Sequence, residues 1–318
     1  NVSNPVPATN TVVLDTVAPA APTGRLGNGT GWSLTSRVQF DLNTTDDDPS
    51  GYTLYLDGDV NGRNGVILWG DKPNAIDLRE GNGLRTVSAY VQDRAGNRSP
   101  TVNLSIMVDD TAPNLRFARI GDNSGYVRDA QGLTFMEINC DDDVARSEDL
   151  RVQVTTLNAG GRGSTVLYDG LYRPVIGLEL GVEERAHELT ARCINAVDLD
   201  DEKASIEVVV DHTAPQVNTF VLNNGRPEDL TRNATVIVNL DVGDNLSGVA
   251  GVALGRSAMD CQIASYIHPA LGQVDFLVSA ANESKRVHLC ARDRAGNVTA
   301  SIASDNAVLL DTIAPLAP

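Results

Sequence analysis

The chain is poor in aromatic residues, and this limits how its hydrophobic cores are built. Only 4% of its 318 residues are Phe, Trp or Tyr and three are Met, whereas 42% are hydrophobic. The cores must therefore consist mostly of Val, Leu, Ile and Ala. No apolar run reaches the length of a membrane span, and no window shows a sustained helical stripe. What is present are short Val-, Ile- and Thr-rich runs between Gly, Asn, Asp and Pro clusters, which is typical of β-strands.

Positive charge is also scarce. The chain has 25 Lys and Arg against 42 Asp and Glu, which leaves a formal net charge of −17. So acidic a protein repels phosphate backbones, and we expect no nucleic-acid binding. The acidity fits three explanations, namely solubility, saline surroundings and bound cations, and the placement of the acidic residues has to decide among them.

A short proline-containing motif, Asp-x-x-Ala-Pro, occurs four times and divides the chain. It begins at Asp15, Asp109, Asp211 and Asp311, at intervals of 94, 102 and 100 residues. Each copy follows an apolar run, so each is predicted to end one strand and lead into the next domain. A period near 100 residues corresponds to a whole small domain.

The motif predicts three complete repeats and parts of two others. Residues 1–15 align without a gap on residues 297–311, which indicates that the chain is an internal fragment. We therefore expect residues 1–14 to be the last strand of a preceding domain, 15–108, 109–210 and 211–310 to be repeats 1, 2 and 3, and 311–318 to begin a following linker or domain.

Repeat 1 carries seven short runs that alternate between apolar and polar residues. The expected strands are Thr23–Leu26, Arg37–Leu42, Tyr52–Leu56, Val66–Trp69, Ala75–Leu78, Arg85–Gln92 and Thr101–Val108. Seven such strands in about 95 residues are typical of an immunoglobulin-like sandwich. Repeats 2 and 3 keep this order. The predicted fold class is therefore all-β, with tandem immunoglobulin-like β-sandwich domains in an elongated array.

Three motifs in a fixed order carry a resemblance to a known family. Asp244-Asn245-Leu246-Ser247-Gly248 precedes Asp293-Arg294-Ala295-Gly296-Asn297, which repeats residues 93–97 letter for letter, and Asp-x-Thr-Ala-Pro follows at the repeat boundaries. This pattern resembles bacterial immunoglobulin-like tandem repeats of the kind found in large surface adhesins. The resemblance implies an extracellular stalk and calcium at the domain junctions. Repeat 2 departs from the pattern, because its corresponding loop lacks Gly-Asn.

The acidic residues gather where such a fold brings loops together. In an immunoglobulin-like sandwich the loops after the second and sixth strands lie at the pole where the first strand begins. Carboxylate and amide oxygens are suited to Ca²⁺, and crowded carboxylates repel one another without a cation. The candidate calcium ligands are Asp15, Asp46, Asp48, Asp93 and Asn97 in repeat 1, Asp109, Asp110, Asp142, Asp143, Asp198 and Asp200 in repeat 2, and Asp211, Asp244, Asn245, Asp293 and Asn297 in repeat 3. The alternative is that these residues only form turns, which favour Asp, Asn, Ser and Gly.

A second acidic motif is interpreted as a turn. Asp57-x-Asp59-x-Asn61-Gly62 matches the first half of an EF-hand loop. The twelfth position, where that loop needs a bidentate Glu, is Leu68. Asp-Gly and Asn-Gly are also strong hairpin signals, and we favour the plain turn.

The four cysteines are expected to form two disulfides. None lies in a Cys-x-x-Cys pair, so a zinc site is not expected. Repeat 2 contains Cys140 and Cys193, and repeat 3 contains Cys261 and Cys290. Two cysteines in each of these two repeats indicate intradomain disulfides and an extracytoplasmic location, and four buried thiols are the alternative. By strand alternation Cys140 and Cys193 face the core, which predicts a bridge across it, whereas Cys290 faces outward, which predicts a surface staple to Cys261.

These observations predict a non-catalytic structural stalk or extender region of a large extracellular bacterial adhesin-like protein, stiffened by Ca²⁺ at its domain junctions. Its expected partners are neighbouring repeats of the same chain, with surface or filament neighbours as a further option. One alternative is a self-assembling surface-layer or filament protein. Another is an accessory carbohydrate-binding module of a secreted enzyme, which would need an exposed aromatic platform.

Overall fold

The structure is a computed structural model that describes residues 14–45, 51–61, 65–200 and 203–314. The described residues form 25 strands and two single-turn 3-10 helices, Trp69–Asp71 and Ser147–Asp149. None of their helices is long and apolar enough to span a bilayer. The chain is therefore all-β, as predicted. Nearly all of the strand expected over residues 1–14 lies outside the described residues.

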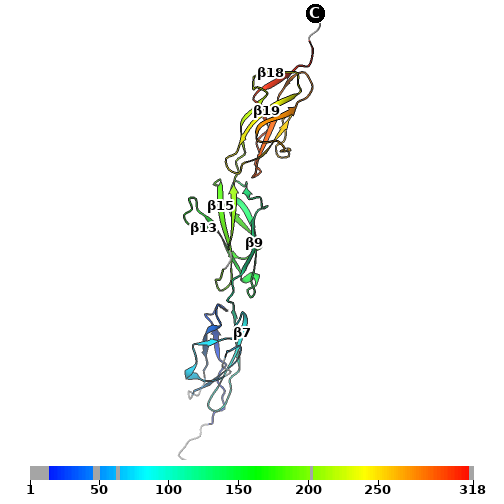
Figure 1. The fold of residues 1–318 in the computed structure, drawn as a ribbon. Coiled ribbons are helices and arrows are strands. Elements are labelled where there is room, and N and C mark those ends of the chain that lie inside the picture. The colour runs from blue at the N-terminus through cyan, green and yellow to red at the C-terminus, as the bar shows by residue number, and fades with distance from the viewer. Residues whose placement is uncertain (1–13, 46–50, 62–64, 201–202, 315–318) are drawn as a thin grey trace, which may run out of the picture. The chain divides into compact units, whose positions relative to one another are not determined.

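Each sheet takes all of its strands from a single one of the three predicted repeats, residues 15–108, 109–210 or 211–310. In Figure 1 the strands of each sheet accordingly share one part of the colour range. Each of the first two stretches forms a five-stranded and a three-stranded sheet, and the third forms three three-stranded sheets. This is the layered arrangement of immunoglobulin-like β-sandwich repeats.

Repeat 1 forms its sandwich from sheets of order β1-β3-β6 and β2-β8-β7-β4-β5. The strands are β1 (Thr23–Leu26), β2 (Trp32–Ser33), β3 (Arg37–Asn43), β4 (Thr53–Gly58), β5 (Gly65–Leu68), β6 (Ala75–Asp77), β7 (Gly83–Gln92) and β8 (Val102–Val108). Alternation buries one face of each long strand, for example Val38, Phe40 and Leu42 of β3 against Val87 and Ala89 of β7. Seven strands match the predicted ones within two residues at each end. The eighth, β2, was missed because a two-residue strand has no alternation; it pairs in parallel with β8.

Repeat 2 has sheets of order β10-β16-β15-β12-β13 and β14-β11-β9. The strands are β9 (Asn114–Ile120), β10 (Tyr126–Val127), β11 (Leu133–Asp141), β12 (Arg151–Leu157), β13 (Ser164–Leu171), β14 (Val175–Glu179), β15 (Arg185–Ile194) and β16 (Lys203–Val210). Gly132 allows the turn into β11, because its φ is +68° and an added Cβ would lie 2.2 Å from the carbonyl oxygen of Gly181.

Repeat 3 has sheets of order β17-β19-β21, β18-β25-β22 and β20-β23-β24. The strands are β17 (Gln216–Leu222), β18 (Glu228–Thr231), β19 (Thr235–Gly243), β20 (Val249–Gly255), β21 (Leu271–Leu277), β22 (Ser284–Lys285), β23 (His288–Asp293), β24 (Ile302–Ala303) and β25 (Ala307–Leu310). Phe220, Leu222 and Leu289 are among the residues of its hydrophobic core.

Grouped by contacts alone, the chain divides into two compact units. The first takes the described residues within Asn1–Asn114, Cys140–Arg151 and Cys193–Glu202, and the second takes those within Leu115–Asn139, Val152–Arg192 and Lys203–Pro318. This division groups one set of loops of repeat 2 with repeat 1. The boundaries of the three expected domains therefore stay a prediction.

Both expected disulfides are present. Cys140 of β11 bonds Cys193 of β15, with Cα atoms 6.1 Å apart. These strands belong to different sheets, so the predicted bridge across the core is confirmed. Cys261 bonds Cys290 of β23, with Cα atoms 5.4 Å apart.

The expected surface position of the second disulfide is wrong. Cys261 is 7% exposed and Cys290 is fully buried. Cys290 does face away from the main core, but Met259 and Tyr266 pack over the disulfide and form a second small cluster with it. Strand alternation showed which side Cys290 faces, but not that a loop covers that side.

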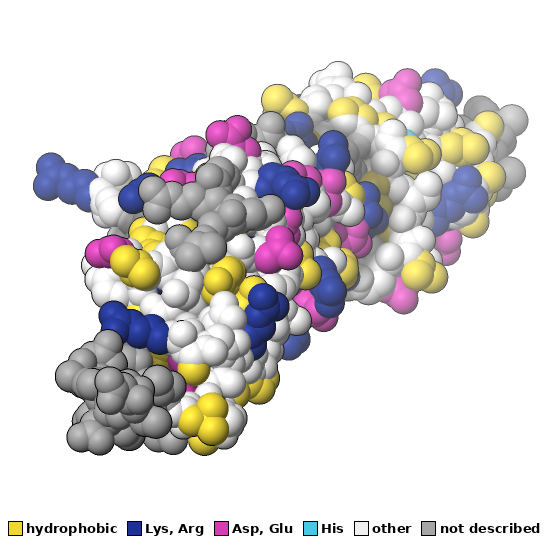
Figure 2. Space-filling model, turned by 90° about the horizontal axis from the view of Figure 1, so that it is seen from below, with side chains coloured by type: hydrophobic (Ala, Val, Ile, Leu, Met, Phe, Trp, Pro, Cys, Tyr) yellow, Lys and Arg dark blue, Asp and Glu magenta, His cyan; other side chains and the backbone are white. Residues whose placement is uncertain are grey.

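The charged side chains do not gather into one patch on the face drawn in Figure 2. Lys and Arg side chains there are interspersed with Asp and Glu.

Candidate metal centre

The linker motif repeats two hydrogen bonds, the first in all four copies and the second in three of them. The side chain of its leading aspartate accepts the N–H two residues further on, in the pairs Asp15–Val17, Asp109–Thr111, Asp211–Thr213 and Asp311–Ile313. The N–H of the aspartate itself donates to a short strand of the preceding repeat, in the pairs Asp109–Ser33, Asp211–Val127 and Asp311–Thr231. The linker thereby holds each of these carboxylates in a defined position.

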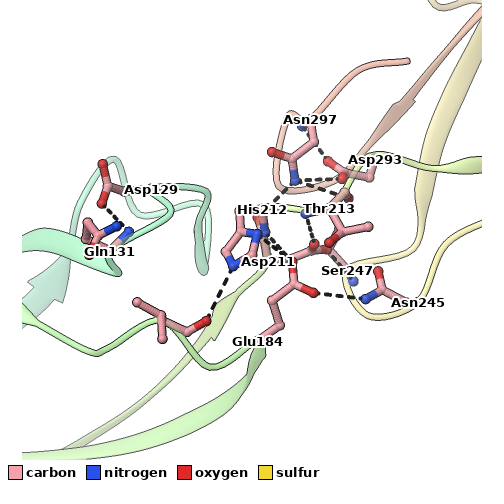
Figure 3. A network of polar contacts seen from close by, with 11 residues as sticks. Asp129, Gln131, Glu184, Asp211, His212, Thr213, Asn245, Ser247, Asp293 and Asn297 are labelled. Carbon is pink, nitrogen blue, oxygen red and sulfur yellow. Dashed lines mark hydrogen bonds and ion pairs between the residues drawn. The ribbon is translucent and has the colours of Figure 1, made fainter. Parts of the chain in front are cut away.

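In repeat 3 the structure brings three of the predicted carboxylates together. One oxygen each of Asp211, Asp244 and Asp293 lies within 4.8 Å of the others. They come from the linker, from the loop after β19 and from the end of β23. Asp211 is fully buried and Asp293 is 1% exposed. Figure 3 shows Asp211 and Asp293 converging from different segments of the chain.

Most oxygens of this cluster accept hydrogen bonds from the backbone. Asp211 Oδ2 accepts Ser247 N–H at 2.9 Å. Asp293 Oδ1 accepts the N–H groups of Gly296 and Asn297 at 2.6 and 2.7 Å. Asp244 Oδ2 accepts two loop N–H groups, but its Oδ1 is buried with no hydrogen-bond partner among the described residues.

Asn245 and Asn297 were predicted to bind the cation through their amide oxygens. The hydrogen bonds described for their side chains are instead made by the amide nitrogens. Asn297 Nδ2 donates to Asp293 Oδ2 and to the carbonyl oxygen of Asp211, at 2.8 and 2.9 Å, and so braces both aspartates. Asn245 is exposed and its Nδ2 donates instead to Glu184 Oε2, at 3.2 Å.

Repeat 2 has an equivalent cluster of Asp109, Asp142 and Asp143, whose contributing oxygens also lie within 4.8 Å of one another. Asp142 Oδ1 accepts the N–H groups of Val144 and Ala145 at 2.8 and 2.7 Å, while its Oδ2 is buried with no partner among the described residues. Asp142 lies 102 residues before Asp244, which is the spacing of the linkers. The two clusters thus leave an oxygen unbonded on equivalent residues.

A residue that the sequence analysis missed completes the site of repeat 2. Asn195 stands where repeats 1 and 3 have Asp93 and Asp293. Its Nδ2 donates to Asp109 Oδ2 at 3.0 Å and to the carbonyl oxygen of Thr111 at 2.8 Å. Aligning the ends of the sixth strands would have found it. Repeat 2 therefore has an amide donor at the position where repeat 3 has the buried carboxylate of Asp293.

Three other residues predicted for repeat 2 lie outside its cluster. Asp110 is exposed, and its N–H donates to Asn82 Oδ1 at 3.0 Å. The side chain of Asp198 is 84% exposed and faces Arg151 at 3.5 Å. Asp200 is half-buried and is not in the group of three.

The site of repeat 1 is described in part, because Asp46 and Asp48 lie outside the described residues. Asp93 is buried and accepts Asn97 N–H and Nδ2 at 2.8 and 2.9 Å. Asn97 Nδ2 also reaches the carbonyl oxygen of Asp15 at 3.2 Å. Asp15 Oδ2 is buried with no partner among the described residues.

The electrostatics of the clusters favour a cation. Burial, followed by the charge of Asp142, raises the pKa of Asp109. Burial also raises the pKa of Asp293, and the charge of Asp211 adds to this.

By contrast, the hydrogen bond from Thr111 lowers the pKa of Asp143. Burial would raise the pKa of Asp93 too, but hydrogen bonds from Asn97, Gly96 and Ala95 outweigh it and lower the pKa. A bound cation would therefore compensate the negative charge most at Asp109 and Asp293, the two carboxyls whose pKa is raised.

The residues present fit a divalent cation that prefers oxygen ligands. Each described site offers a buried carboxylate oxygen without a partner, on Asp15, Asp142 or Asp244. In repeats 2 and 3 two further carboxylates lie beside it. Hard oxygen donors in a flexible arrangement suit Ca²⁺ better than zinc, which prefers nitrogen and sulfur.

The EF-hand-like motif has protein partners for its carboxylates. Asp57 Oδ1 accepts Gly58 N–H at 2.8 Å. Asp59 Oδ2 accepts Thr86 N–H at 3.0 Å, and its Oδ1 faces Arg79 at 3.6 Å. These bonds support the interpretation as a plain turn. Gly62 lies outside the described residues.

The sheets and the linkers define this chain as a protein of tandem immunoglobulin-like β-sandwich repeats. No protein-family model matches the sequence, and no curated protein matches it. Among solved structures, the chain is similar to the fibronectin(III)-like modules of Clostridium thermocellum CbhA, with 12% identity over 62% of this chain and 93% of that one and a TM-score of 0.35.

Two similar structures come from other multidomain proteins. The chicken CNTN1 FN1–FN3 domains share 9% identity over 90% of this chain and 99% of that one, with a TM-score of 0.33. The I-band fragment I67–I69 from titin shares 12% over 93% and 100%, with a TM-score of 0.37. All three TM-scores are low, so the fold assignment rests on the strand pairing described above.

Proposed function

We propose that this chain is a non-catalytic spacer of a large extracellular adhesin-like protein, and that Ca²⁺ bound at its linkers stiffens it. The two disulfides fit a secreted protein, because such bonds persist in oxidising compartments. The repetition of one domain type along the chain fits a role in spacing, because every added domain lengthens the chain by a similar folded unit.

One observation carries the calcium proposal. Asp142 and Asp244, at equivalent positions of repeats 2 and 3, each leave one buried carboxylate oxygen that has no partner among the described residues and lies beside two other carboxylates. Turn formation explains the oxygens that accept backbone N–H groups, but it does not explain the oxygens left unbonded. A cation would satisfy them and offset the repulsion among the charges.

Calcium titration of the full chain tests the proposal. The chain is stripped with chelator and titrated with CaCl₂ in an isothermal calorimeter, and its thermal midpoint is followed in parallel. We expect binding heat and a higher midpoint in calcium than in chelator. Absence of both heat and midpoint change would refute calcium binding.

Small-angle scattering then tests the stiffening. We expect the scattering curve in calcium to be described by a narrower range of interdomain arrangements than the curve in chelator. Binding heat without any change in scattering would mean that calcium binds but does not stiffen the linkers.

A further inference from the structure

Three polar side chains at equivalent positions contact the linker that follows their own repeat. They are Asn82, Glu184 and Asn282, called the clamp residues below. They lie one or two residues before β7, β15 and β22. Their spacings of 102 and 98 residues follow the repeat period. None was among the predicted site residues.

Each clamp residue accepts the same backbone N–H. Asn82 Oδ1 accepts Asp110 N–H at 3.0 Å, Glu184 Oε1 accepts His212 N–H at 2.8 Å, and Asn282 Oδ1 accepts Thr312 N–H at 3.2 Å. In every case the donor is the residue directly after the leading aspartate of the linker. The same contact at three places in one chain, made by two residue types, shows that the acceptor oxygen is the common requirement.

The clamp residues also contact linker side chains. Asn82 Nδ2 donates to Thr111 Oγ1 at 2.9 Å, and Thr312 Oγ1 donates to Asn282 Oδ1 at 2.8 Å. Glu184 lies 3.1 Å from His212 Nδ1. Its side chain is only 19% exposed, so water competes weakly for these bonds.

In two cases the clamp residue reaches a loop beyond the linker. Asn82 Nδ2 donates to Asp143 Oδ2 at 3.2 Å, and Glu184 Oε2 accepts Asn245 Nδ2 at 3.2 Å. Figure 3 shows Glu184 between His212 and Asn245. Both loops are the ones that carry the unbonded carboxylate of the next cluster. The side chains of Asn82 and Glu184 therefore each connect three segments: the turn before the sixth strand of their own repeat, the linker, and the acidic loop of the next repeat.

With the clamp, three successive N–H groups are satisfied by protein in the linkers that begin at Asp109, Asp211 and Asp311. The aspartate N–H donates to the preceding repeat, the next N–H to the clamp residue, and the third to the aspartate's own carboxylate. The proline of the motif has no N–H to satisfy. Only the second of these bonds depends on a side chain from outside the linker.

We propose that Asn82, Glu184 and Asn282 are positioning residues that fix the path of the chain out of each repeat, without a cation. The inference rests on the proposed function in that it assigns part of the junction stiffness to these side chains rather than to calcium. The clamp holds the linker in chelator, and calcium adds to a linker that is already ordered.

Hydrogen exchange of the full chain in chelator tests this at Glu184. In Glu184→Ala we expect the His212 amide to exchange about tenfold faster, the factor that one typical hydrogen bond provides. Glu184→Gln retains an acceptor oxygen and should keep the slow exchange. Glu183→Ala is the matched control, because Glu183 is exposed and pairs with Arg185.

Equal exchange at His212 in Glu184→Ala and in the parent chain would overturn the proposal. If Glu184→Ala loses protection throughout β15 as well, the decision passes to Asn282→Ala, read at the Thr312 amide. Unchanged exchange there would equally overturn it. If the chain shows neither binding heat nor a change of thermal midpoint with calcium, the proposed function is contradicted. Faster exchange of the His212 amide in Glu184→Ala would still support the clamp in that case.

Discussion

At the scale of single residues, we expect a buried histidine to make the stability of repeat 2 depend on pH. His187 lies on the core face of β15 and is fully buried. Burial lowers the pKa of His187 below its ordinary value of 6.5, and the charge of Arg185 adds to this. The folded state therefore favours the neutral form of this side chain.

The lowered pKa of His187 predicts acid sensitivity. Below about pH 6.5 the unfolded state binds a proton that the folded state does not, so stability is full above that pH and is lost as pH falls. Between pH 8 and pH 5 the loss should be at most about 2 kcal/mol. Hydrogen exchange of β15 and β16 peptides at several pH values measures it.

His187→Leu should remove this part of the pH dependence. Val208→Ala is the control, because Val208 is paired with His187 and its loss weakens the same core without removing a titrating group. An equal fall in stability from pH 8 to pH 5 in the parent chain and in His187→Leu would show that His187 is not responsible.

A second prediction at this scale concerns Asp244. In Asp244→Asn an amide nitrogen can replace the unbonded oxygen and donate to a neighbouring carboxylate, in the way that Asn195 Nδ2 donates to Asp109 Oδ2 in repeat 2. Without calcium the variant should be more stable than the parent chain, by about 1 kcal/mol, because a like charge is lost and a donor is gained. With calcium, repeat 3 should no longer be stabilised.

The measurement for Asp244→Asn is the thermal midpoint with calcium and with chelator. Asp275→Asn on β21 makes the same charge change at an exposed position outside the cluster. If repeat 3 responds to calcium equally in Asp244→Asn and in the parent chain, Asp244 is not a ligand.

At the scale of structural elements, the two disulfides should have different effects. Cys140–Cys193 closes a separation of 53 residues and joins two sheets. Cys261–Cys290 closes 29 residues and lies in a separate small cluster. The main core of repeat 3, which includes Leu289 and Ala291, does not contain it.

Replacing Cys140 and Cys193 by Ala should cost repeat 2 about 4 kcal/mol on the loop-closure estimate. Replacing Cys261 and Cys290 should cost somewhat less, about 3.5 kcal/mol on the same estimate. Hydrogen exchange should show the first loss across repeat 2 and the second concentrated between β20 and β21. Loss of protection throughout repeat 3 in the second variant would mean that the small cluster supports the main core.

At the scale of the whole molecule, the net charge of −17 means that added salt can act in two ways, by screening charge repulsion and by binding of its cation. NaCl screens repulsion among exposed charges and should raise the thermal midpoint only modestly. Calcium at a few millimolar adds little ionic strength, but occupied sites stabilise the folded chain by mass action. At 100 times Kd the gain is about 2.7 kcal/mol for each site.

We therefore expect millimolar CaCl₂ to raise the midpoint more than NaCl of equal ionic strength. MgCl₂ is the matched control, since Mg²⁺ demands octahedral geometry and releases its water reluctantly. Equal midpoints in all three salts would assign the whole effect to screening.

The sequence by itself determined most strands of repeat 1 and the cysteine pairing. Alternation with a period of two is a local property, so β3, β7 and β8 could be predicted within two residues. The repeated linker motif marked the repeats, and two cysteines in each of two repeats left one intradomain pairing apiece. The convergence of Asp211, Asp244 and Asp293 also followed, because the fold class fixes which loops share a pole.

Only the tertiary structure decided which oxygens meet and which side chains are covered. Asn195 reaches Asp109 across 86 residues, the loop containing Met259 covers Cys290, and Asn245 turns to Glu184 rather than to the cluster. These outcomes depend on loop conformations and on contacts between distant segments, which no local pattern specifies. The same reason hid the clamp residues, because Asn82, Glu184 and Asn282 differ in type and share only the backbone N–H that each accepts.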